Sequence, residues 1–171
     1  MTSNSGTVVS RAPNRTIHML RGWHCQFVKI VNGFQSPFLL LVRLYWGWQF
    51  MTTGWGKLHN LPRVTEFFSS LGIPAPGFTA QAIATLEFLG GILLIVGLAN
   101  RVIGLLLACN MLAAYLASDR EALKSIFSDP GKFYNADPFT FLLASLIVLV
   151  FGAGFYSLDY AMSRRKRVRA A

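Results

Sequence analysis

Two charged residues lie inside long apolar stretches of this sequence, and they are the residues best placed to do chemistry. Arg43 lies within residues 37–58, and Glu87 lies near the middle of residues 77–98. A charge at the centre of a bilayer costs at least about 2.5 to 3.5 kcal/mol, so each of them needs a polar partner or a purpose. We therefore expect both side chains to turn into the protein, out of contact with acyl chains.

Two carboxylates compete as partners for Arg43. At about 1.5 Å per residue, Arg43 and Glu87 differ in depth by about one extended side chain. Side chains lean toward the N-terminus of their own helix, however, so Arg43 and Glu87 lean apart in antiparallel helices. Asp159, which follows the last apolar stretch, is the alternative partner. A bond to both carboxylates also stays open, because a guanidinium has five donors.

The same depth estimate places Gln49 and Asn110 at the level of Glu87, so three stretches contribute polar groups to one layer. One interpretation is a hydrogen-bonded clasp in which Glu87 is protonated, because burial disfavours the charged form. The other is a binding site for a polar head group such as a quinone carbonyl, with an aromatic lining of Tyr45, Trp46, Trp48 and Trp55. Tyr and Trp also gather at bilayer interfaces, so lipid contact is the competing use of these aromatic residues. We predict no catalytic residue and no metal site.

The composition indicates a membrane protein. The chain has 171 residues, of which 53% are hydrophobic and only 13% charged, whereas soluble proteins average about 25% charged residues. The formal net charge of +9 is concentrated at the two ends of the chain instead of along one exposed face. This distribution indicates membrane topology, and we expect no nucleic-acid partner.

Four stretches hold the roughly 20 mainly apolar residues that a helix needs to cross a bilayer. They are residues 37–58, 77–98, 101–118 and 138–158. Ser36-Pro37 and Asp137-Pro138 are typical of a capping residue followed by proline at the first helical position, which predicts helix starts there. The sequence therefore predicts an all-α membrane protein, with an antiparallel four-transmembrane-helix bundle over residues 37–159.

Lysine and arginine residues set the predicted orientation of the bundle. Basic residues precede the first stretch, follow the fourth and occupy the tight turn between the second and third; they are Arg11, Arg15, Arg21, Lys29, Arg164, Arg165, Lys166, Arg167, Arg169 and Arg101. Such residues favour the cytoplasmic side. We expect a multi-pass protein with both termini in the cytoplasm, and we expect the loops that carry Lys57, Arg63, Arg120, Lys124 and Lys132 on the opposite side.

Three segments lie outside the predicted bundle. Residues 1–14 are predicted to be disordered, and residues 160–171 form a basic cytoplasmic tail. In residues 15–33, apolar residues recur at three- and four-residue steps between basic ones, which is typical of an amphipathic helix. We expect this N-terminal helix to lie at the membrane interface, and docking to a partner protein is the alternative.

Four motifs, in order, resemble those of the DoxX family of bacterial four-span membrane proteins. They are the sequences of residues 43–58, 71–76, 86–91 and 151–159, and the resemblance extends over residues 38–159. It implies a four-helix bundle in the bacterial inner membrane, in which Arg43, Glu87 and Asp159 correspond to the family's first-span arginine, second-span glutamate and closing acid. The family's Gly-Pro-Gly reads Gly152-Ala153-Gly154 here, which could alter how the fourth span ends.

The resemblance also implies a function. Some relatives are subunits of a thiosulfate:quinone oxidoreductase, and others are linked to redox assemblies. We expect an accessory subunit of a membrane redox or electron-transfer complex that holds a quinone or lipid, with no enzyme activity of its own. The alternative is a free-standing quinone-linked oxidoreductase of thiosulfate or a similar small reductant, in which Glu87 relays protons. A small transporter is disfavoured, because no paired interrupted helices suggest inverted repeats.

Overall fold

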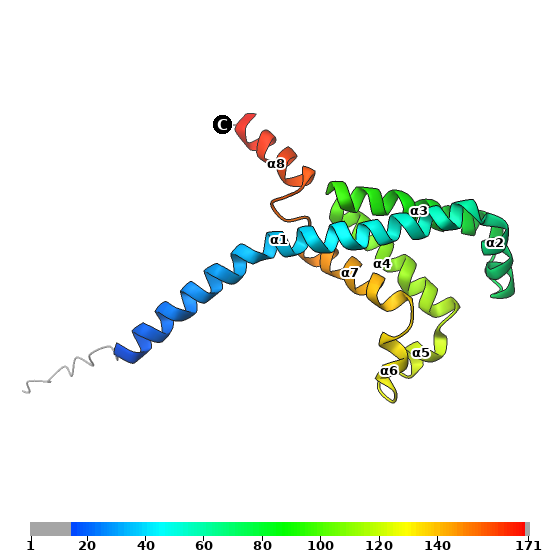
Figure 1. Ribbon diagram of the computed structural model, residues 1–171, viewed down its shortest axis with the longest axis horizontal. Coiled ribbons are helices and arrows are strands. Elements are labelled where there is room, and N and C mark those ends of the chain that lie inside the picture. The colour runs from blue at the N-terminus through cyan, green and yellow to red at the C-terminus, as the bar shows by residue number, and fades with distance from the viewer. Residues whose placement is uncertain (1–14, 170–171) are drawn as a thin grey trace, which may run out of the picture. The chain divides into compact units, whose positions relative to one another are not determined.

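A computed structural model describes residues 15–169, and all regular structure within this range is helical. Figure 1 shows the helices α1 (Arg15–His59), α2 (Leu61–Ser70), α3 (Pro76–Val96), α4 (Asn100–Ala117), α5 (Arg120–Lys124), α6 (Pro130–Tyr134), α7 (Pro138–Phe151) and α8 (Leu158–Arg169). The predicted all-α class is confirmed for this range. The prediction for residues 1–14 lies outside the described residues, as do residues 170 and 171 of the predicted tail.

Three helices are long and apolar enough to cross a membrane. They are the part of α1 from Gln26 to His59, the whole of α3 and the whole of α4. The fourth apolar helix, α7, has only 14 residues, so it measures about 21 Å against a hydrocarbon core of about 30 Å. The chain thus has three to four candidate membrane helices, and the predicted fourth span of residues 138–158 ends earlier than expected.

Helix α1 continues through Pro37, so the predicted helix start at this residue is wrong. A proline inside a helix removes one backbone hydrogen bond and crowds the carbonyl four residues earlier, which belongs here to Gly33. The other backbone groups along the helix keep their partners, as an apolar environment demands. One proline therefore does not end α1.

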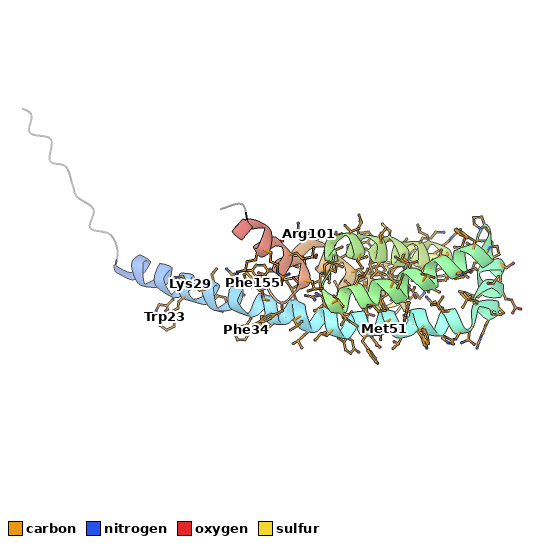
Figure 2. The ribbon with its side chains drawn as sticks, turned by 90° about the horizontal axis from the view of Figure 1, so that it is seen from above. Trp23, Lys29, Phe34, Met51, Arg101 and Phe155 are labelled. Carbon is orange, nitrogen blue, oxygen red and sulfur yellow. The ribbon has the colours of Figure 1, made fainter. Side chains whose placement is uncertain are left out.

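The part of α1 up to Phe34 belongs to a compact unit separate from the rest of the chain. Its described apolar side chains Trp23, Phe27, Val31 and Phe34 are exposed, and Figure 2 shows Trp23 and Phe34 projecting from the helix. Their steps of four, four and three residues place them on one helix face. Most other residues of the predicted amphipathic pattern have side chains outside the described set, and the interfacial position of this segment stays a prediction.

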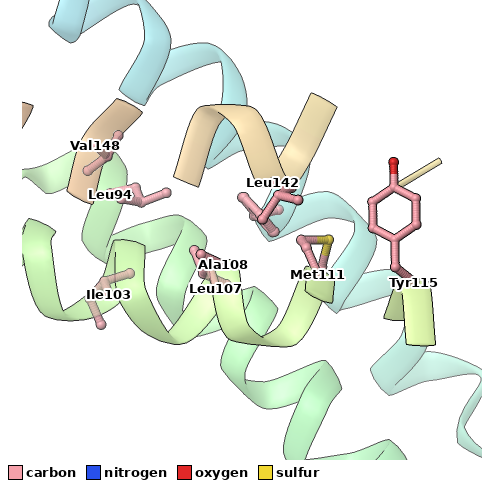
Figure 3. Packing of buried hydrophobic residues seen from close by; sticks show 9 residues of the cluster. Leu94, Ile103, Leu107, Ala108, Met111, Tyr115, Leu142 and Val148 are labelled. Carbon is pink, nitrogen blue, oxygen red and sulfur yellow. The ribbon is translucent and has the colours of Figure 1, made fainter. Parts of the chain in front are cut away.

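The core of the second unit lies where α4 packs against α7. Figure 3 shows its buried cluster of Phe50, Leu94, Ile103, Leu107, Ala108, Met111, Tyr115, Leu142 and Val148. Tyr115 extends this core toward α6, since its hydroxyl donates to the carbonyl of Phe133 at 2.8 Å and its ring stacks on that of Phe133. Gly104 lets the two main helices approach closely, because a Cβ at this position would lie 3.0 Å from the carbonyl oxygen of Ser145.

Helices α1 and α3 run antiparallel in close backbone contact. A Cβ at Gly91 would lie 2.5 Å from the carbonyl oxygen of Gly47 and from the backbone nitrogen of Met51. One to two turns away, a Cβ at Gly54 would meet the backbone of α3 at Ala84 and Phe88. Small residues allow such approach between membrane helices. This contact brings the polar side chains of α1 within reach of α3.

We predict that Gly91→Ala and Gly54→Ala each destabilise the folded protein by about 1 to 3 kcal/mol, because the added methyl group meets backbone atoms that cannot move aside. Gly56→Ala is the matched control, since a Cβ at Gly56 has no neighbour within 4 Å. The measurement is thermal unfolding in detergent, followed by circular dichroism. Equal unfolding temperatures for the three variants would contradict close α1–α3 packing.

Candidate functional site

Arg43 is 1% exposed, and its guanidinium donates four hydrogen bonds to main-chain carbonyls. Nε donates to Leu94 at 2.9 Å and Nη2 to Ile95 at 3.1 Å, both near the C-terminal end of α3. Nη1 donates to Ala153 at 2.6 Å and to Tyr156 at 2.9 Å. The carbonyl end of a helix carries partial negative charge. The buried cation is therefore satisfied by backbone acceptors.

The acceptors Ala153 and Tyr156 belong to residues 152–157, where the prediction placed the end of the fourth span. The chain leaves α7 at Phe151 and turns at Gly152 and Gly154, whose φ angles are +75° and +70°. Glycine adopts such angles without steric cost. The departure from the family's Gly-Pro-Gly therefore keeps the two glycines that the turn uses.

Asp159 links the start of α8 to the start of α4. Its carboxylate accepts hydrogen bonds from the backbone N–H groups of Ala99 at 2.8 Å and Asn100 at 3.1 Å, and from the Asn100 side chain at 3.3 Å. Burial by itself raises the pKa of Asp159, but these hydrogen bonds and the positive charge of Arg43 outweigh burial and hold the pKa below its usual value. Asp159 is thus an anionic cap on α4.

Neither of the two predicted partners, Glu87 and Asp159, accepts a hydrogen bond from Arg43. Glu87 lies seven residues before Leu94, or about 10 Å away along α3, and Asp159 acts on Arg43 through its charge alone. Among the described side chains the ion pairs are Lys57–Glu87 and Lys132–Asp129. The physical reason is that carbonyls at a helix end satisfy a guanidinium without the cost of dehydrating a second charge.

Glu87 instead forms a polar triad with Lys57 and Asn110, one residue from each of α1, α3 and α4. Nζ of Lys57 lies 2.7 Å from Oε1 and 2.6 Å from Oε2 of Glu87, and Nδ2 of Asn110 donates to Oε1 at 3.0 Å. Glu87 is 2% exposed, whereas the side chain of Lys57 is 35% exposed. Glu87 and Asn110 therefore lie together, as their equal depth predicts. Lys57 is the cation that completes the site.

Lys57 was not predicted as a partner of Glu87, because it was counted with the loop residues that set the orientation, although the predicted span of residues 37–58 contains it. Helix α1 continues to His59, so Lys57 is helical. The tendency of side chains to lean toward their helix N-terminus could have found the pair, because Lys57 on α1 and Glu87 on the antiparallel α3 lean toward each other. This same rule had argued against pairing Glu87 with Arg43.

Gln49 and the predicted aromatic lining lie outside this site. The side chain of Gln49 is half-buried and makes no hydrogen bond within the described part of the chain. Tyr45, Trp48 and Trp55 are exposed, and Trp46 packs its ring against Phe141 at 5.1 Å. The predicted layer of Arg43, Gln49, Glu87, Asn110 and Asp159 is thus two separate networks, without Gln49.

The polar triad forms part of the wall of a cavity of about 840 Å³. Much of the wall is apolar or aromatic, with Phe50, Val64, Phe67, Phe68, Met111 and Phe141 among the lining residues. Three further charged residues, Arg63, Asp119 and Asp137, also line it. None of Tyr45, Trp46, Trp48 and Trp55 does. A cavity with apolar walls and a few convergent polar groups suits a small ligand with a polar head.

Among the side chains that the structure describes, no three or more His, Cys, Asp or Glu residues cluster in a way that could hold a metal ion. The chemistry that the described site offers is hydrogen bonding and charge. Lys57 and Asn110 supply donors, and Glu87 supplies a carboxylate at the cavity wall. Such a site can bind and orient a head group.

Apolar helices of membrane-spanning length, with a buried arginine and a buried glutamate in separate polar networks, define an integral membrane protein. Comparison with known proteins gives the particular family. Residues 38–119 match the DoxX family, and the chain belongs to it.

Three relatives from different bacteria are similar over most of the chain. "Putative oxidoreductase CatD" of Bacillus subtilis is 31% identical over 128 residues, which cover 75% of this chain and 89% of the relative. "Uncharacterized membrane protein Rv3486" of Mycobacterium tuberculosis is 28% identical over 149 residues, covering 80% and 88%. "Inner membrane protein YqjF" of Escherichia coli is 25% identical over 130 residues, covering 74% and 93%. No solved structure matches.

We predict that Lys57→Met destabilises the protein, because it leaves the carboxylate of Glu87 buried without its cation. The loss should be smaller than the roughly 3 to 5 kcal/mol typical of a fully buried pair, since Lys57 is one-third exposed. The double variant Lys57→Met with Glu87→Met should recover most of the loss. Thermal unfolding of the wild type, both single variants and the double variant measures this coupling, and strictly additive effects would contradict the ion pair.

Proposed function

We propose that this DoxX protein is an accessory membrane subunit of a redox or electron-transfer complex, and that it holds a quinone or a lipid in the cavity beside the polar triad. The observation that carries the proposal is the position of Lys57, Glu87 and Asn110 in a wall that is otherwise largely apolar. Such a wall accommodates an apolar body, while the triad bonds a polar head group. A relative that is named as an oxidoreductase supports a redox setting.

The hydrogen bonds that Glu87 already makes favour a role in binding a ligand over a role in catalysis by the isolated chain. A proton relay needs a carboxylate that can bond the reacting group. In this structure Oε1 of Glu87 already accepts from Lys57 and Asn110, and Oε2 accepts from Lys57. A carboxylate engaged in this way orients a ligand better than it takes up a proton. The free-standing oxidoreductase of thiosulfate or a similar small reductant is the alternative.

The proposed setting is the bacterial inner membrane, crossed four times by an antiparallel bundle with both termini in the cytoplasm. The fourth crossing would consist of α7 together with residues 152–157, in which Arg43 satisfies the carbonyls of Ala153 and Tyr156. The basic residues at both ends of the chain support this orientation, and the name of the Escherichia coli relative supports the membrane. Residues 15–33 would lie on the cytoplasmic surface, and the cavity would lie in the outer half of the bundle.

The test is purification of the full chain from its native membrane in mild detergent, with identification of the proteins that co-purify. Thiosulfate-dependent quinone reduction is then assayed with and without those proteins. We expect redox proteins to co-purify and the isolated chain to be inactive. Gln49→Leu is the matched control for Glu87→Gln, since Gln49 lies outside the cavity.

The opposite result would be activity of the isolated chain that is lost in Glu87→Gln and kept in Gln49→Leu. That outcome would replace the accessory role with the free-standing oxidoreductase.

A further inference from the structure

Asn110 has an acceptor that no protein group satisfies. Its residue is 9% exposed, and its Nδ2 is committed to Glu87 at 3.0 Å. The carbonyl oxygen of its side chain accepts no hydrogen bond within the described part of the chain, and Asn110 lines the cavity. The oxygen is not fully buried, since the fully buried side-chain atom without a partner in the described part of the chain is Oδ1 of Asn100, so it is accessible from the cavity. This oxygen therefore identifies the place in the wall where a ligand has a donor to offer.

The rest of the triad has both donors and acceptors to spare. The ammonium of Lys57 has three N–H groups, and Glu87 receives the bonds of Nζ at Oε1 and Oε2. Oε2 of Glu87 accepts only from Lys57, so it has room for a second donor. Asn110 keeps one N–H that is not used. A ligand at this wall meets acceptors and donors side by side.

These groups select a neutral hydroxyl over other head groups. A carbonyl only accepts, so it would leave the side-chain oxygen of Asn110 unpaired. Lys57 and Glu87 neutralise each other in their ion pair, so the triad offers no net charge to attract an anion or a cation. A hydroxyl both donates and accepts, and it matches the triad without adding a charge.

The aromatic residues of the cavity wall favour a ligand in which that hydroxyl is attached to a flat ring. Phe50, Phe68 and Phe141 line the cavity together with the triad, and aromatic side chains pack well against aromatic rings. A lipid with free hydroxyl groups, such as a diacylglycerol, offers the same hydrogen bonds without the ring.

We propose that the cavity prefers the reduced, hydroquinone form of a quinone over the oxidised form, with a ring hydroxyl donating to the side-chain oxygen of Asn110. The proposal rests on the proposed function, since it specifies which form of the quinone is held. A subunit with this preference would retain the reduced carrier and release the oxidised one.

The test measures binding to the isolated full chain in phosphatidylcholine nanodiscs by anaerobic isothermal titration calorimetry. The probes are decylubiquinol, decylubiquinone, the dimethyl ether of decylubiquinol, which has no hydroxyl donor, and dioleoylglycerol. We expect decylubiquinol to bind at least about tenfold more tightly than decylubiquinone and the dimethyl ether, which is the effect of one buried hydrogen bond. Asn110→Leu should remove this difference by weakening decylubiquinol alone, and Gln49→Leu should leave it unchanged.

The comparison of probes on the wild-type protein needs no variant, so a folding defect in Asn110→Leu would not remove the test. Equal or tighter binding of decylubiquinone, or no binding of either form, would overturn the proposal. Displacement of decylubiquinol by an equal concentration of dioleoylglycerol would overturn it in favour of a hydroxylated lipid. Because the assay uses the isolated chain, its result is independent of whether redox proteins co-purify.

Discussion

A guanidinium inside an apolar bundle must find its hydrogen-bond acceptors within the protein, and this constraint organises one end of the molecule. Arg43 reaches the carbonyls at the C-terminal end of α3 and those of residues 152–157. The turn that presents the latter requires α7 to stop at Phe151. Asp159 follows this turn and caps α4, so one buried cation sets the arrangement of α3, α4 and α8 around it.

Glu87, the second buried charge, must also find its hydrogen-bond partners within the protein, but its partners are side chains and not backbone carbonyls. Glu87 lies about 10 Å from the Arg43 network along α3, and it is satisfied by side chains from α1 and α4. Arg43 is surrounded by backbone that it holds in place, which is a structural role. The polar triad borders a cavity and keeps donors and acceptors unused, which is what a binding site requires.

The sequence was sufficient to predict the helical membrane class and the burial of Arg43 and Glu87, because both follow from the cost of dehydrating charge. It also placed Asn110 at the level of Glu87. It could not predict the carbonyl partners of Arg43, since these depend on the backbone path at Gly152 and Gly154, and any residue type supplies a carbonyl. Lys57 was missed for a different reason: it was counted only among the basic residues that set the orientation, although the predicted span of residues 37–58 contains it and α1 extends to His59.

The measurement that tests the role of Arg43 most directly compares thermal unfolding of Arg43→Lys with that of the wild type in the same detergent. Lysine keeps the charge but cannot span carbonyls on both α3 and residues 152–157, and each buried carbonyl left unpaired costs about 1 to 3 kcal/mol. Arg63→Lys, at an exposed position without a hydrogen bond in the described range, is the control. A clear fall in unfolding temperature for Arg43→Lys alone is the predicted result. Equal unfolding temperatures for the two variants and the wild type would show that charge at position 43 suffices and that the carbonyl network does not organise the bundle.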